Sequence, residues 1–422
     1  GQAVYKISFL ISIPMQTIFH VDGDAFFAAC EQSIHPDWRG RAVVTGAERG
    51  IVSAASYEAK ARGVSRATAL WDVHRIIPNA IIVSSDYETY SLFSKRMFNI
   101  IRRFTPEVEE YSIDEAFADM TGQDRRHGCS YRELACQMQV AVMNELGISI
   151  SIGIGPSKVL AKVGSKWKKP SGITEITIET REQYLQALEI GKIWGIGSAH
   201  ATRFRMMGVR TAQQFAAMPA SIVKQSFDKP LKELWHEING SMINPVSTSI
   251  KQDYKSISKM ETFTPPSSNA AYLKARMMRN VEHACAKARR YGLLASGVSL
   301  YLRKQDFRSS YSEAKLSVDS AYPGEIFSVI EELFENLFEP WELYRATAVT
   351  LTGLHKMTGS QKALFENYEP STKQSLVYKS IDMLSAKYGN HAVMTGTSLR
   401  LPVQLTQQRQ RRINLPVLHV AV

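Results

Sequence analysis

Cysteine is scarce in this sequence of 422 residues, which has only four: Cys30, Cys129, Cys136 and Cys285. No two of them form a Cys-x-x-Cys pair, so neither a disulfide scaffold nor a structural zinc site is expected. The scarcity favours a reducing, cytoplasmic setting. No apolar run approaches the roughly 20 residues of a membrane-spanning helix, so no insertion into a membrane is expected. We interpret residues 1–16, whose apolar part is interrupted by serines, as an N-terminal extension rather than a signal peptide.

Acidic residues are also under-represented, with 40 Asp and Glu against 51 Lys and Arg, which gives a formal charge of +11. The hydrophobic share of 44% and the charged share of 22% exclude a wholly disordered chain. The length suggests about two to four domains. Residues 251–316 contain 13 basic and 5 acidic residues and therefore carry +8 of the total. This excess predicts a polyanionic partner, and charge alone leaves nucleic acid and a membrane surface both open.

The basic block combines a predicted helix, 270–291, with a strand-like run, 297–302. Lys274 and Arg276 belong to the helix, whereas three basic residues follow the strand: Arg303, Lys304 and Arg308. A basic helix beside a basic strand would suit phosphate groups, and a solvated helix face is the alternative. Residues 244–266, which overlap the start of the block, are rich in Ser, Thr, Lys and Pro and are the best candidate for a linker.

Upstream of the basic block, hydrophobic periodicity predicts a mixture of strands and helices. Strands are expected at 17–21, 41–45, 50–55 and 148–154, with a hairpin or two short strands at 108–120. Helices are expected from residue 57, at 87–104, 131–146 and 156–167, and as short helices with glycine turns over 179–239. Residues beyond 357 read as a weakly patterned tail.

The first candidate site is Asp22-Gly23-Asp24, which follows an apolar strand. Carboxylates at the end of such a strand place negative charge where burial is costly. A divalent cation would remove that cost, and Gly23 would let a backbone carbonyl approach the ion closely. An ordinary Asp-Gly-Asp turn is the alternative.

The second candidate is the adjacent pair Asp114 and Glu115, within the otherwise apolar run 111–119. Neighbouring strand residues point to opposite faces, so both carboxylates could serve one site only at a strand end or twist. Together with Asp22 they could bind two magnesium ions about 3.5–4 Å apart, because magnesium prefers hard oxygen ligands. A solvated hairpin tip is the alternative.

Three further groups have chemistry suited to phosphates. Tyr57 and Lys60 lie one helical turn apart and present a hydroxyl and a cation that would suit a triphosphate. Lys169 belongs to a Lys-Lys-Pro-Ser-Gly segment, for which a simple basic turn is the alternative. Gly195-Ile196-Gly197 is similar to a helix–hairpin–helix turn, whose N–H groups can hold a DNA phosphate.

Taken in order, these residues resemble the Y-family, or translesion, DNA polymerases of the DNA polymerase IV or UmuC-like type. The resemblance extends from about residue 17 to residue 357. Its most specific segments are Phe19–Phe27, Ser56–Ala59, Ser112–Phe117 and Gly153–Lys162.

The resemblance implies an α+β, multidomain, right-hand architecture. It assigns a palm to 17–26 and 83–177, fingers to 27–82 and a helical thumb with a helix–hairpin–helix to 178–246. A linker at 247–254, a little finger at 255–357 and a tail at 358–422 would follow.

The same resemblance implies a role for each candidate residue. Asp22, Asp114 and Glu115 would bind two Mg²⁺ ions with help from the Gly23 carbonyl. Phe27 would be the steric gate that excludes a ribose 2′-hydroxyl, with core packing as the alternative because Phe26 is equally apolar.

The incoming dNTP would be held by Tyr57, Lys60 and Lys169. Two positions depart from the family pattern. Lys60 replaces a more usual Arg and lacks its bidentate fork, and Gly23 stands where a larger residue is common.

DNA contacts are implied for two regions. Gly195 and Gly197 would bind the backbone from the thumb, and the little finger would use five basic residues: Lys274, Arg276, Arg303, Lys304 and Arg308. In the tail, Gln361-Lys362-Ala363-Leu364-Phe365 resembles the Q-x-x-L-F peptide that binds the bacterial sliding clamp. Leu364 and Phe365 would fill a pocket, and Gln361 would supply a polar contact.

The expected activity is template-directed addition of dNTPs to a primer 3′-hydroxyl of primer–template DNA by two-metal nucleotidyl transfer. Small fingers would imply low fidelity and translesion synthesis, in DNA repair and the SOS response of a cytoplasmic, nucleoid-associated protein. One rival is a non-catalytic DNA-binding scaffold of the same fold, which is expected to lack the carboxylates. Another is a two-metal cyclase or nuclease on a palm-like core, which the thumb motif and the basic C-terminal domain disfavour.

Overall fold

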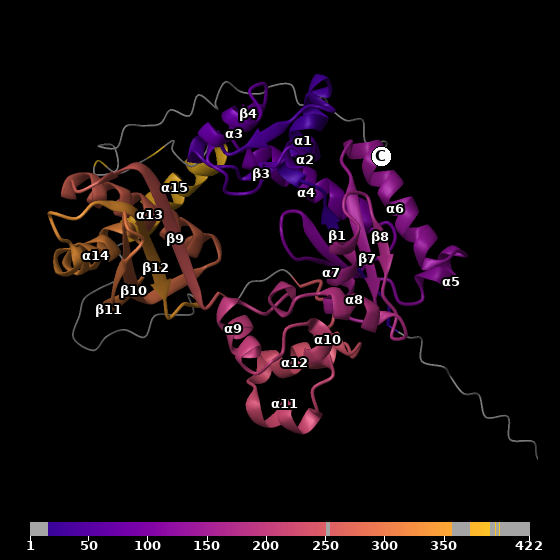
Figure 1. Ribbon diagram of the computed structural model, residues 1–422. Helices are drawn as coiled ribbons and strands as arrows, with labels where there is room; N and C mark the ends of the chain where they lie inside the picture. Colours follow the sequence, from indigo (N-terminus) through magenta and orange to yellow (C-terminus); the bar gives the residue numbers. More distant parts are fainter. Residues whose placement is uncertain (1–15, 250–253, 357–371, 389–392, 394–395, 397–422) are drawn as a thin grey trace, which may run out of the picture. The chain divides into compact units, whose positions relative to one another are not determined.

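The computed structural model describes residues 16–249, 254–356, 372–388, 393 and 396. The chain divides near residue 250 into two compact units, one before this point and one after it (Figure 1). The division falls inside the segment 247–254 that the sequence predicts as a linker. Both units combine helices with sheets, in agreement with the expected α+β class.

A five-stranded sheet forms the centre of the first unit, in the order β5-β6-β1-β7-β8. Its strands are β1 (Ile18–Gly23), β5 (Val108–Glu110), β6 (Glu115–Asp119), β7 (Ile150–Gly155) and β8 (Ile173–Glu175). Neighbours are antiparallel except β7 and β8. On one face, Phe19 and Val21 join a buried core with helices α4 (Tyr87–Ile101) and α6 (Tyr131–Leu146). Because strand side chains alternate, His20 and Asp22 lie on the other face.

That other face is covered by α7 (Lys158–Trp167), which the Ser157 hydroxyl caps by accepting the N–H of Leu160. The helix approaches the sheet very closely at Gly153, where an added Cβ would lie 1.8 Å from the carbonyl oxygen of Ala161. A glycine is therefore required at this contact. The close approach brings the lysines of α7 onto the face of the sheet that carries Asp22.

A smaller sheet in the order β3-β2-β4 follows α1 (Phe26–Ile34), which contacts β2 and β3. Its elements are β2 (Val43–Thr45), β3 (Ala54–Ala55), β4 (Ile81–Val83), α2 (Tyr57–Ala61) and α3 (Leu70–Ile76), with two 3₁₀ turns (Pro36–Trp38 and Ala47–Arg49). The Ser56 side chain caps α2 by accepting from the N–H of Ala59. This cap fixes the start of the helix that carries Tyr57 and Lys60.

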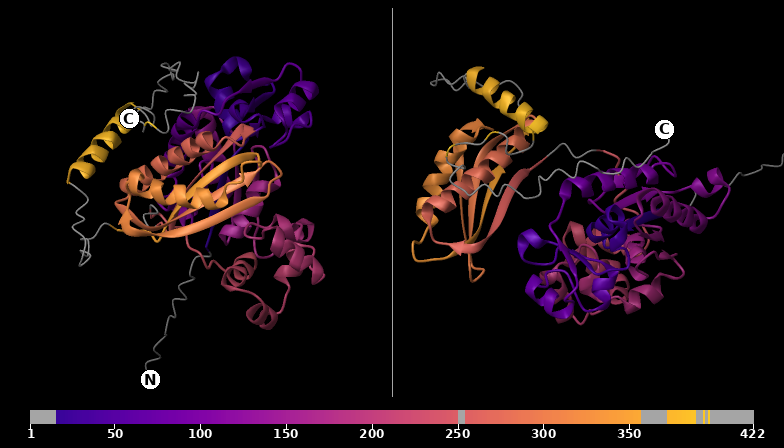
Figure 2. Two further views of the ribbon diagram at one scale, coloured as in Figure 1. Left: turned by 90° about the vertical axis from the view of Figure 1, so that its left-hand side faces the viewer. Right: turned by 90° about the horizontal axis from the view of Figure 1, so that it is seen from above.

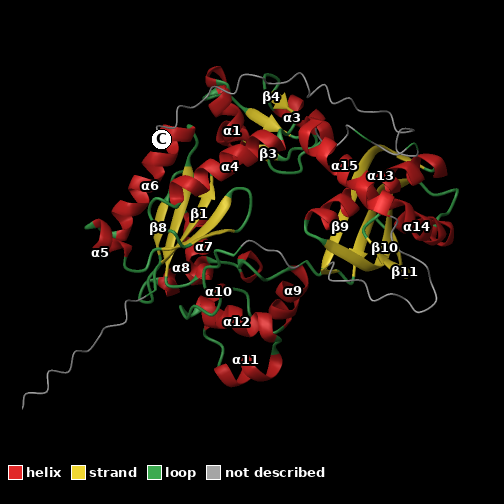
Figure 3. Cartoon of the chain, turned by 180° about the vertical axis from the view of Figure 1, so that it is seen from behind, coloured by secondary structure: helices red, strands yellow, loops and turns green. Residues whose placement is uncertain are grey.

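The rest of the first unit is a helical segment around its own apolar core (Figure 3). It contains α8 (Arg181–Ala187), a 3₁₀ turn (Ile190–Lys192), α9 (Ser198–Met206), α10 (Ala212–Ala216), α11 (Ala220–Ser226) and α12 (Lys229–Ile238). Gly195 has a φ of +97°, a conformation that favours glycine, and Gly197 directly precedes α9. The predicted pattern of short helices with glycine turns is confirmed.

The second unit contains a five-stranded antiparallel sheet, in which four strands follow the order β11-β10-β12-β9 and β13 pairs with β10. Its elements are β9 (Ser256–Ser267), α13 (Ala270–Arg290), β10 (Leu293–Lys304), β11 (Ser309–Ser320), α14 (Pro323–Leu337), β12 (Tyr344–Thr352), β13 (His355–Lys356) and α15 (Thr372–Tyr388). Figure 2 shows α13 and α14 side by side on one face of this sheet, where they bury its apolar side chains. The opposite face carries Tyr311 and Met260, which are 57% and 54% exposed.

One prediction about this region is wrong. The polar stretch 244–266 is not a linker throughout, because from Ser256 it forms β9. Pairing with β12 and burial of Ile257 and Phe263 outweigh its polar composition. The weakly patterned tail beyond 357 contains α15, and Arg289 of α13 forms two hydrogen bonds with Asp382 of this helix, 2.8 and 2.7 Å long.

One short helix, α5 (Gln123–His127), completes the described elements of the first unit. Among all the helices that the structure describes, none combines the length and apolar character needed to cross a membrane. The four cysteines are free thiols, as their spacing predicted.

Candidate active site

The structure brings the three predicted carboxylates together at one end of the central strand pair. Asp22 on β1 and Glu115 on β6 are direct partners in the antiparallel register. Asp114 immediately precedes β6, and its carbonyl accepts the N–H of Gly23 at 2.8 Å. Asp114 thus lies at a strand end. Side chains within a strand alternate between its two faces, so the neighbours Asp114 and Glu115 can serve one site only at such an end.

Two lysines neutralise part of this charge. The Lys169 ammonium donates to Asp22 and lies 3.4 Å from Oδ1 of Asp24. The Lys162 ammonium of α7 lies 2.8 Å from Oε2 of Glu115. The side chain of Asp114 instead accepts from the Ser112 hydroxyl at 2.6 Å. The lysines therefore stand as internal counter-ions on two of the three carboxylates.

These lysines do not fully compensate the negative charge. The pKa of Asp22 is raised to about 6, mainly by burial and also by the nearby charges of Glu115 and Asp114, while Lys169 acts in the opposite direction. The neighbouring His20 is fully buried, and burial together with Lys162, Lys166 and Lys169 lowers its pKa well below the ordinary value. The site consequently favours an added cation at the carboxylates and keeps His20 neutral.

The raised pKa of Asp22 predicts a pH-dependent stability. The folded state binds this proton more tightly than the unfolded state, so the free energy of unfolding should fall as pH rises from about 4 to about 6. In chelator-treated protein, Asp22→Asn should remove this fall and stabilise the fold at pH 7.5 by roughly 1–3 kcal/mol. Denaturant unfolding at several pH values measures both effects.

Asp37→Asn is the control, since Asp37 is exposed on a 3₁₀ turn. Its curve should follow that of the wild type. A wild-type curve that stays level or rises over this pH range would contradict the raised pKa.

The three predicted triphosphate contacts also lie together, beside Asp24. The Tyr57 hydroxyl is 3.5 Å from Oδ1 of Asp24, and the Lys60 ammonium is 4.3 Å from the centroid of the Tyr57 ring. Burial raises the pKa of Tyr57 and lowers that of Lys60, to which the charge of Lys169 also contributes. A hydroxyl and two ammonium groups therefore converge next to the carboxylates.

Asp24 itself received no role from the sequence. It is 1% exposed and accepts from the Ser151 hydroxyl and from the Ser171 N–H, both at 2.8 Å. These bonds attach the loop that carries Lys169 to the start of α1. The sequence signal for this positioning function was the presence of a second carboxylate, Asp24, in the Asp-Gly-Asp motif.

Phe27 is held in a defined orientation by an aromatic neighbour. Its half-buried ring stacks on Tyr90 of α4 with centroids 4.5 Å apart and an interplanar angle of 15°. The Tyr90 hydroxyl donates to the buried Glu31 at 2.8 Å. Phe26, in contrast, is 3% exposed, and a Cβ at Gly23 would lie 2.8 Å from its ring. The two phenylalanines thus have different environments, and Phe26 fills the space that a larger residue at 23 would need.

Four of the five basic residues predicted to contact DNA in the second unit are paired with acids. Lys274 lies 2.8 Å from Glu335, Arg276 donates to Glu261, Lys304 lies 3.1 Å from both Glu339 and Glu342, and Arg308 lies 2.5 Å from Asp306. Arg276 and Lys304 are also buried. Arg303 instead lies against the rings of Tyr301 and Phe307.

The remaining predicted residues are two glycines in the thumb segment and three residues in the tail. Gly195 and Gly197 form the turn before α9, as described above. Gln361, Leu364 and Phe365 lie outside the described residues.

The donor chemistry of the site suits magnesium, because carboxylate and carbonyl oxygens are its preferred protein ligands. Within the described residues, however, no three His, Cys, Asp or Glu side chains converge closely enough to hold one ion as they stand. Lys162 and Lys169 occupy two of the carboxylates in this arrangement. The residues therefore fit a divalent metal once these lysines move.

The fold is that of a Y-family DNA polymerase. It matches a solved Y-family DNA polymerase chimera of Dbh and Dpo4 with a TM-score of 0.68 at 21% identity, covering 81% of this chain and 99% of that one.

The chain belongs to the impB/mucB/samB family, the Y-family DNA polymerases of the polymerase IV type. The family model matches residues 21–166, and the model of its C-terminal domain matches 254–364. The DNA polymerase IV of Clostridium kluyveri is 31% identical over 396 residues, which are 91% of this chain and 98% of the relative. That of Alkalilimnicola ehrlichii is 32% identical over 348 residues, 82% of this chain and 97% of the relative. DNA polymerase IV 1 of Bacillus subtilis is 29% identical over 390 residues.

Proposed function

We propose that this chain is a template-directed DNA polymerase that adds dNTPs to a primer 3′-hydroxyl by two-metal nucleotidyl transfer. The observation that carries the proposal is the register of Asp22 opposite Glu115, with Asp114 at the adjoining strand end. A like-charged cluster with a raised Asp22 pKa has no structural benefit unless cations bind there. Low fidelity, translesion synthesis and action in an SOS response are part of this proposal through the family.

The side chains of Asp22, Asp114 and Glu115, with the carbonyl of Gly23, would hold two Mg²⁺ ions. When bound, these supply Lewis-acid stabilisation of the attacking hydroxyl and of the pyrophosphate leaving group. The chain's own contribution is to bring the carboxylates to one end of the strand pair and to balance part of their charge with Lys162 and Lys169.

Lys169, Lys60 and Tyr57 would bind the triphosphate of the incoming nucleotide. Lys169 now donates to Asp22, and it would exchange this partner for a phosphate oxygen when Asp22 binds metal. Lys60 supplies a second ammonium and Tyr57 a hydroxyl donor. These groups would orient the α-phosphate and compensate the charge that develops on the leaving group.

The open face of the sheet in the second unit is the proposed DNA-binding surface there. On β10, Val298, Leu300 and Leu302 are buried towards the helices, so Tyr301 and Arg303 lie on the opposite face. Arg303 is opposite Ala346 of β12, and Tyr301 is opposite Ala348, so small neighbours leave these side chains room. The proposed surface is this face and not the basic side of α13, because Lys274 and Arg276 of that helix are already paired with acidic residues.

This choice of face predicts a contrast between two variants. Arg303→Gln should weaken duplex DNA binding roughly 3–10-fold and lower the salt-dependence slope by about 1, because one phosphate contact is lost. Lys274→Gln should leave the affinity unchanged, since Lys274 is paired with Glu331 and Glu335. Fluorescence anisotropy of labelled DNA over a series of salt concentrations measures both. If Lys274→Gln weakened DNA binding more than Arg303→Gln, the DNA-binding surface would instead lie on the helices.

Magnesium-dependent primer extension separates this function from a non-catalytic DNA-binding scaffold. The wild type should extend a primer on undamaged templates and past damaged bases, and DNA binding without extension would favour the scaffold. A sliding-clamp interaction through Gln361, Leu364 and Phe365 is proposed from the sequence alone.

A further inference from the structure

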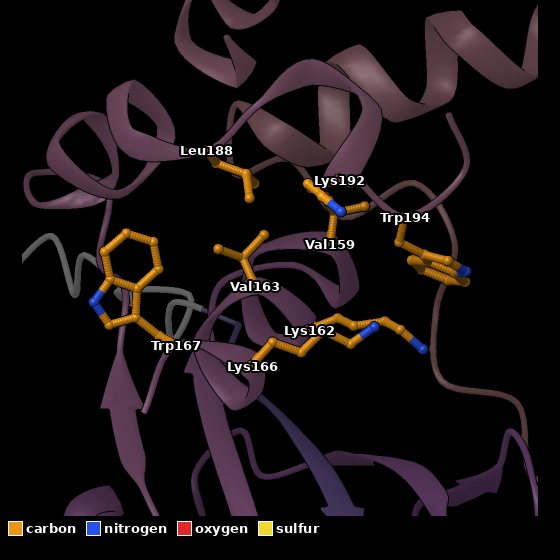
Figure 4. Close-up of a pocket in the computed structure, with 8 residues that line it drawn as sticks. All are labelled: Val159, Lys162, Val163, Lys166, Trp167, Leu188, Lys192 and Trp194. Carbon is orange, nitrogen blue, oxygen red and sulfur yellow. The ribbon is translucent and has the colours of Figure 1, made fainter. Parts of the chain in front are cut away.

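A pocket of about 90 Å³ lies between α7 and the loop around the 3₁₀ turn at 190–192 in the first unit (Figure 4). Three lysines, two tryptophans and three aliphatic side chains line it. The lysines are Lys162, Lys166 and Lys192, and the tryptophans are Trp167 and Trp194. Figure 4 shows the tryptophans at opposite ends with the lysines between them. No acidic residue lines the pocket.

The charge of this pocket is only partly compensated. Lys162 is buried and committed to Glu115, whereas Lys166 and Lys192 are exposed. In the described part of the chain neither of these two has a carboxylate within 4.0 Å. Lys274 of α13 and Lys304 of β10, in contrast, have acidic neighbours. Two lysines that line one pocket without an acidic partner there favour an external anion.

The aromatic ends of the pocket are rigid. The indole N–H of Trp194 donates to the Tyr111 hydroxyl at 2.9 Å, and its ring packs on Phe117 with centroids 5.5 Å apart. Trp167 lies edge-on to Tyr184 at 4.9 Å and is 38% exposed. Fixed aromatic surfaces beside ammonium groups suit a phosphate that is attached to planar or apolar groups.

We propose that this pocket binds a phosphate group through Lys166 and Lys192, beside the ring of Trp194. The phosphate can come from the backbone of a DNA strand or from free pyrophosphate, and both share the same recognition chemistry. The site is separate from the triphosphate contacts Tyr57, Lys60 and Lys169, none of which lines the pocket. The proposal concerns binding alone, so it does not depend on the proposed nucleotidyl transfer.

The test uses the full chain without divalent metal and the double variant Lys166→Gln/Lys192→Gln. The matched control is Lys224→Gln, an exposed lysine on α11 that does not line the pocket. Inorganic pyrophosphate binding is followed by calorimetry, and labelled primer–template DNA by anisotropy at about 50 mM and about 200 mM salt. The double variant should weaken at least one probe roughly tenfold while the control leaves both unchanged.

The two probes distinguish the sources of the phosphate. Loss of DNA affinity, with a salt slope lower by about 2, supports a backbone phosphate. Loss of pyrophosphate affinity alone supports the free ion, and loss of both supports a pocket that accepts either. The proposal is overturned if the double variant weakens neither probe more than Lys224→Gln does. Primer extension by Asp114→Asn tests the catalytic proposal independently.

Discussion

Asp114→Asn should lower the rate of primer extension at least roughly 10³-fold, which corresponds to about 4 kcal/mol of transition-state stabilisation. Asn keeps the size of the side chain and an oxygen that can accept from the Ser112 hydroxyl, so the turn before β6 should persist. It removes the negative charge that would hold a divalent metal at the strand end. Single-turnover extension of a labelled primer at saturating Mg²⁺ and dNTP measures the loss.

The control for Asp114→Asn is Glu110→Gln, on the neighbouring strand β5. Glu110 is exposed and pairs with Arg102 at 2.6 Å, so this variant removes a carboxylate from the same sheet and should retain near wild-type extension. DNA binding by both variants should match the wild type. Extension by Asp114→Asn at a normal rate would refute the metal assignment.

Phe27→Ala should reduce discrimination between dNTPs and rNTPs by roughly 10²-fold or more, about 2.7 kcal/mol. The Phe27 ring has a fixed plane because it stacks on Tyr90, whose hydroxyl is bound to Glu31. A rigid ring can exclude a 2′-hydroxyl, whereas a methyl group leaves room for it. The ratio of kcat/KM values for dCTP and CTP opposite template dG measures the effect.

The ratio of the two kcat/KM values distinguishes a steric-gate function of Phe27 from general destabilisation of the fold. Both substrates are tested with the same enzyme, so a loss of folded protein affects them equally. Phe104→Ala is a matched control, since Phe104 is also a half-buried phenylalanine packed on the same core. It should lower stability without changing the sugar ratio. An unchanged ratio in Phe27→Ala would assign this residue to packing only.

Local patterns in the sequence predicted the elements that frame the site. Helix α6 has the predicted bounds, 131–146, and α13 differs from the predicted helix by one residue. These helices depend on short-range periodicity and on caps such as Ser130, whose capping box lies within four residues. The carboxylates were predictable for a similar reason, because charge at the end of an apolar strand is visible in the local sequence.

Contacts between distant segments were not predictable in this way. The pairing of Lys162 with Glu115 and the stacking of Phe27 on Tyr90 depend on how α7 and α4 pack on the sheet. The acids that pair with Lys274 and Lys304 come from α14 and the segment after it. A residue's charge is readable from the sequence, but whether that charge is free depends on partners many residues away.

At the proposed metal site, the lysines on Asp22 and Glu115 would make metal capture an ion-exchange reaction. Each divalent ion that bound there would displace an ammonium group, so its net affinity would be the difference between two competing ionic contacts. The displaced Lys169 would then be available to a triphosphate, and the displaced Lys162 would remain at the proposed phosphate pocket beside Trp194. Arrival of the metals would therefore raise the affinity for both anions. By thermodynamic reciprocity, nucleotide and DNA phosphates would draw the metals in.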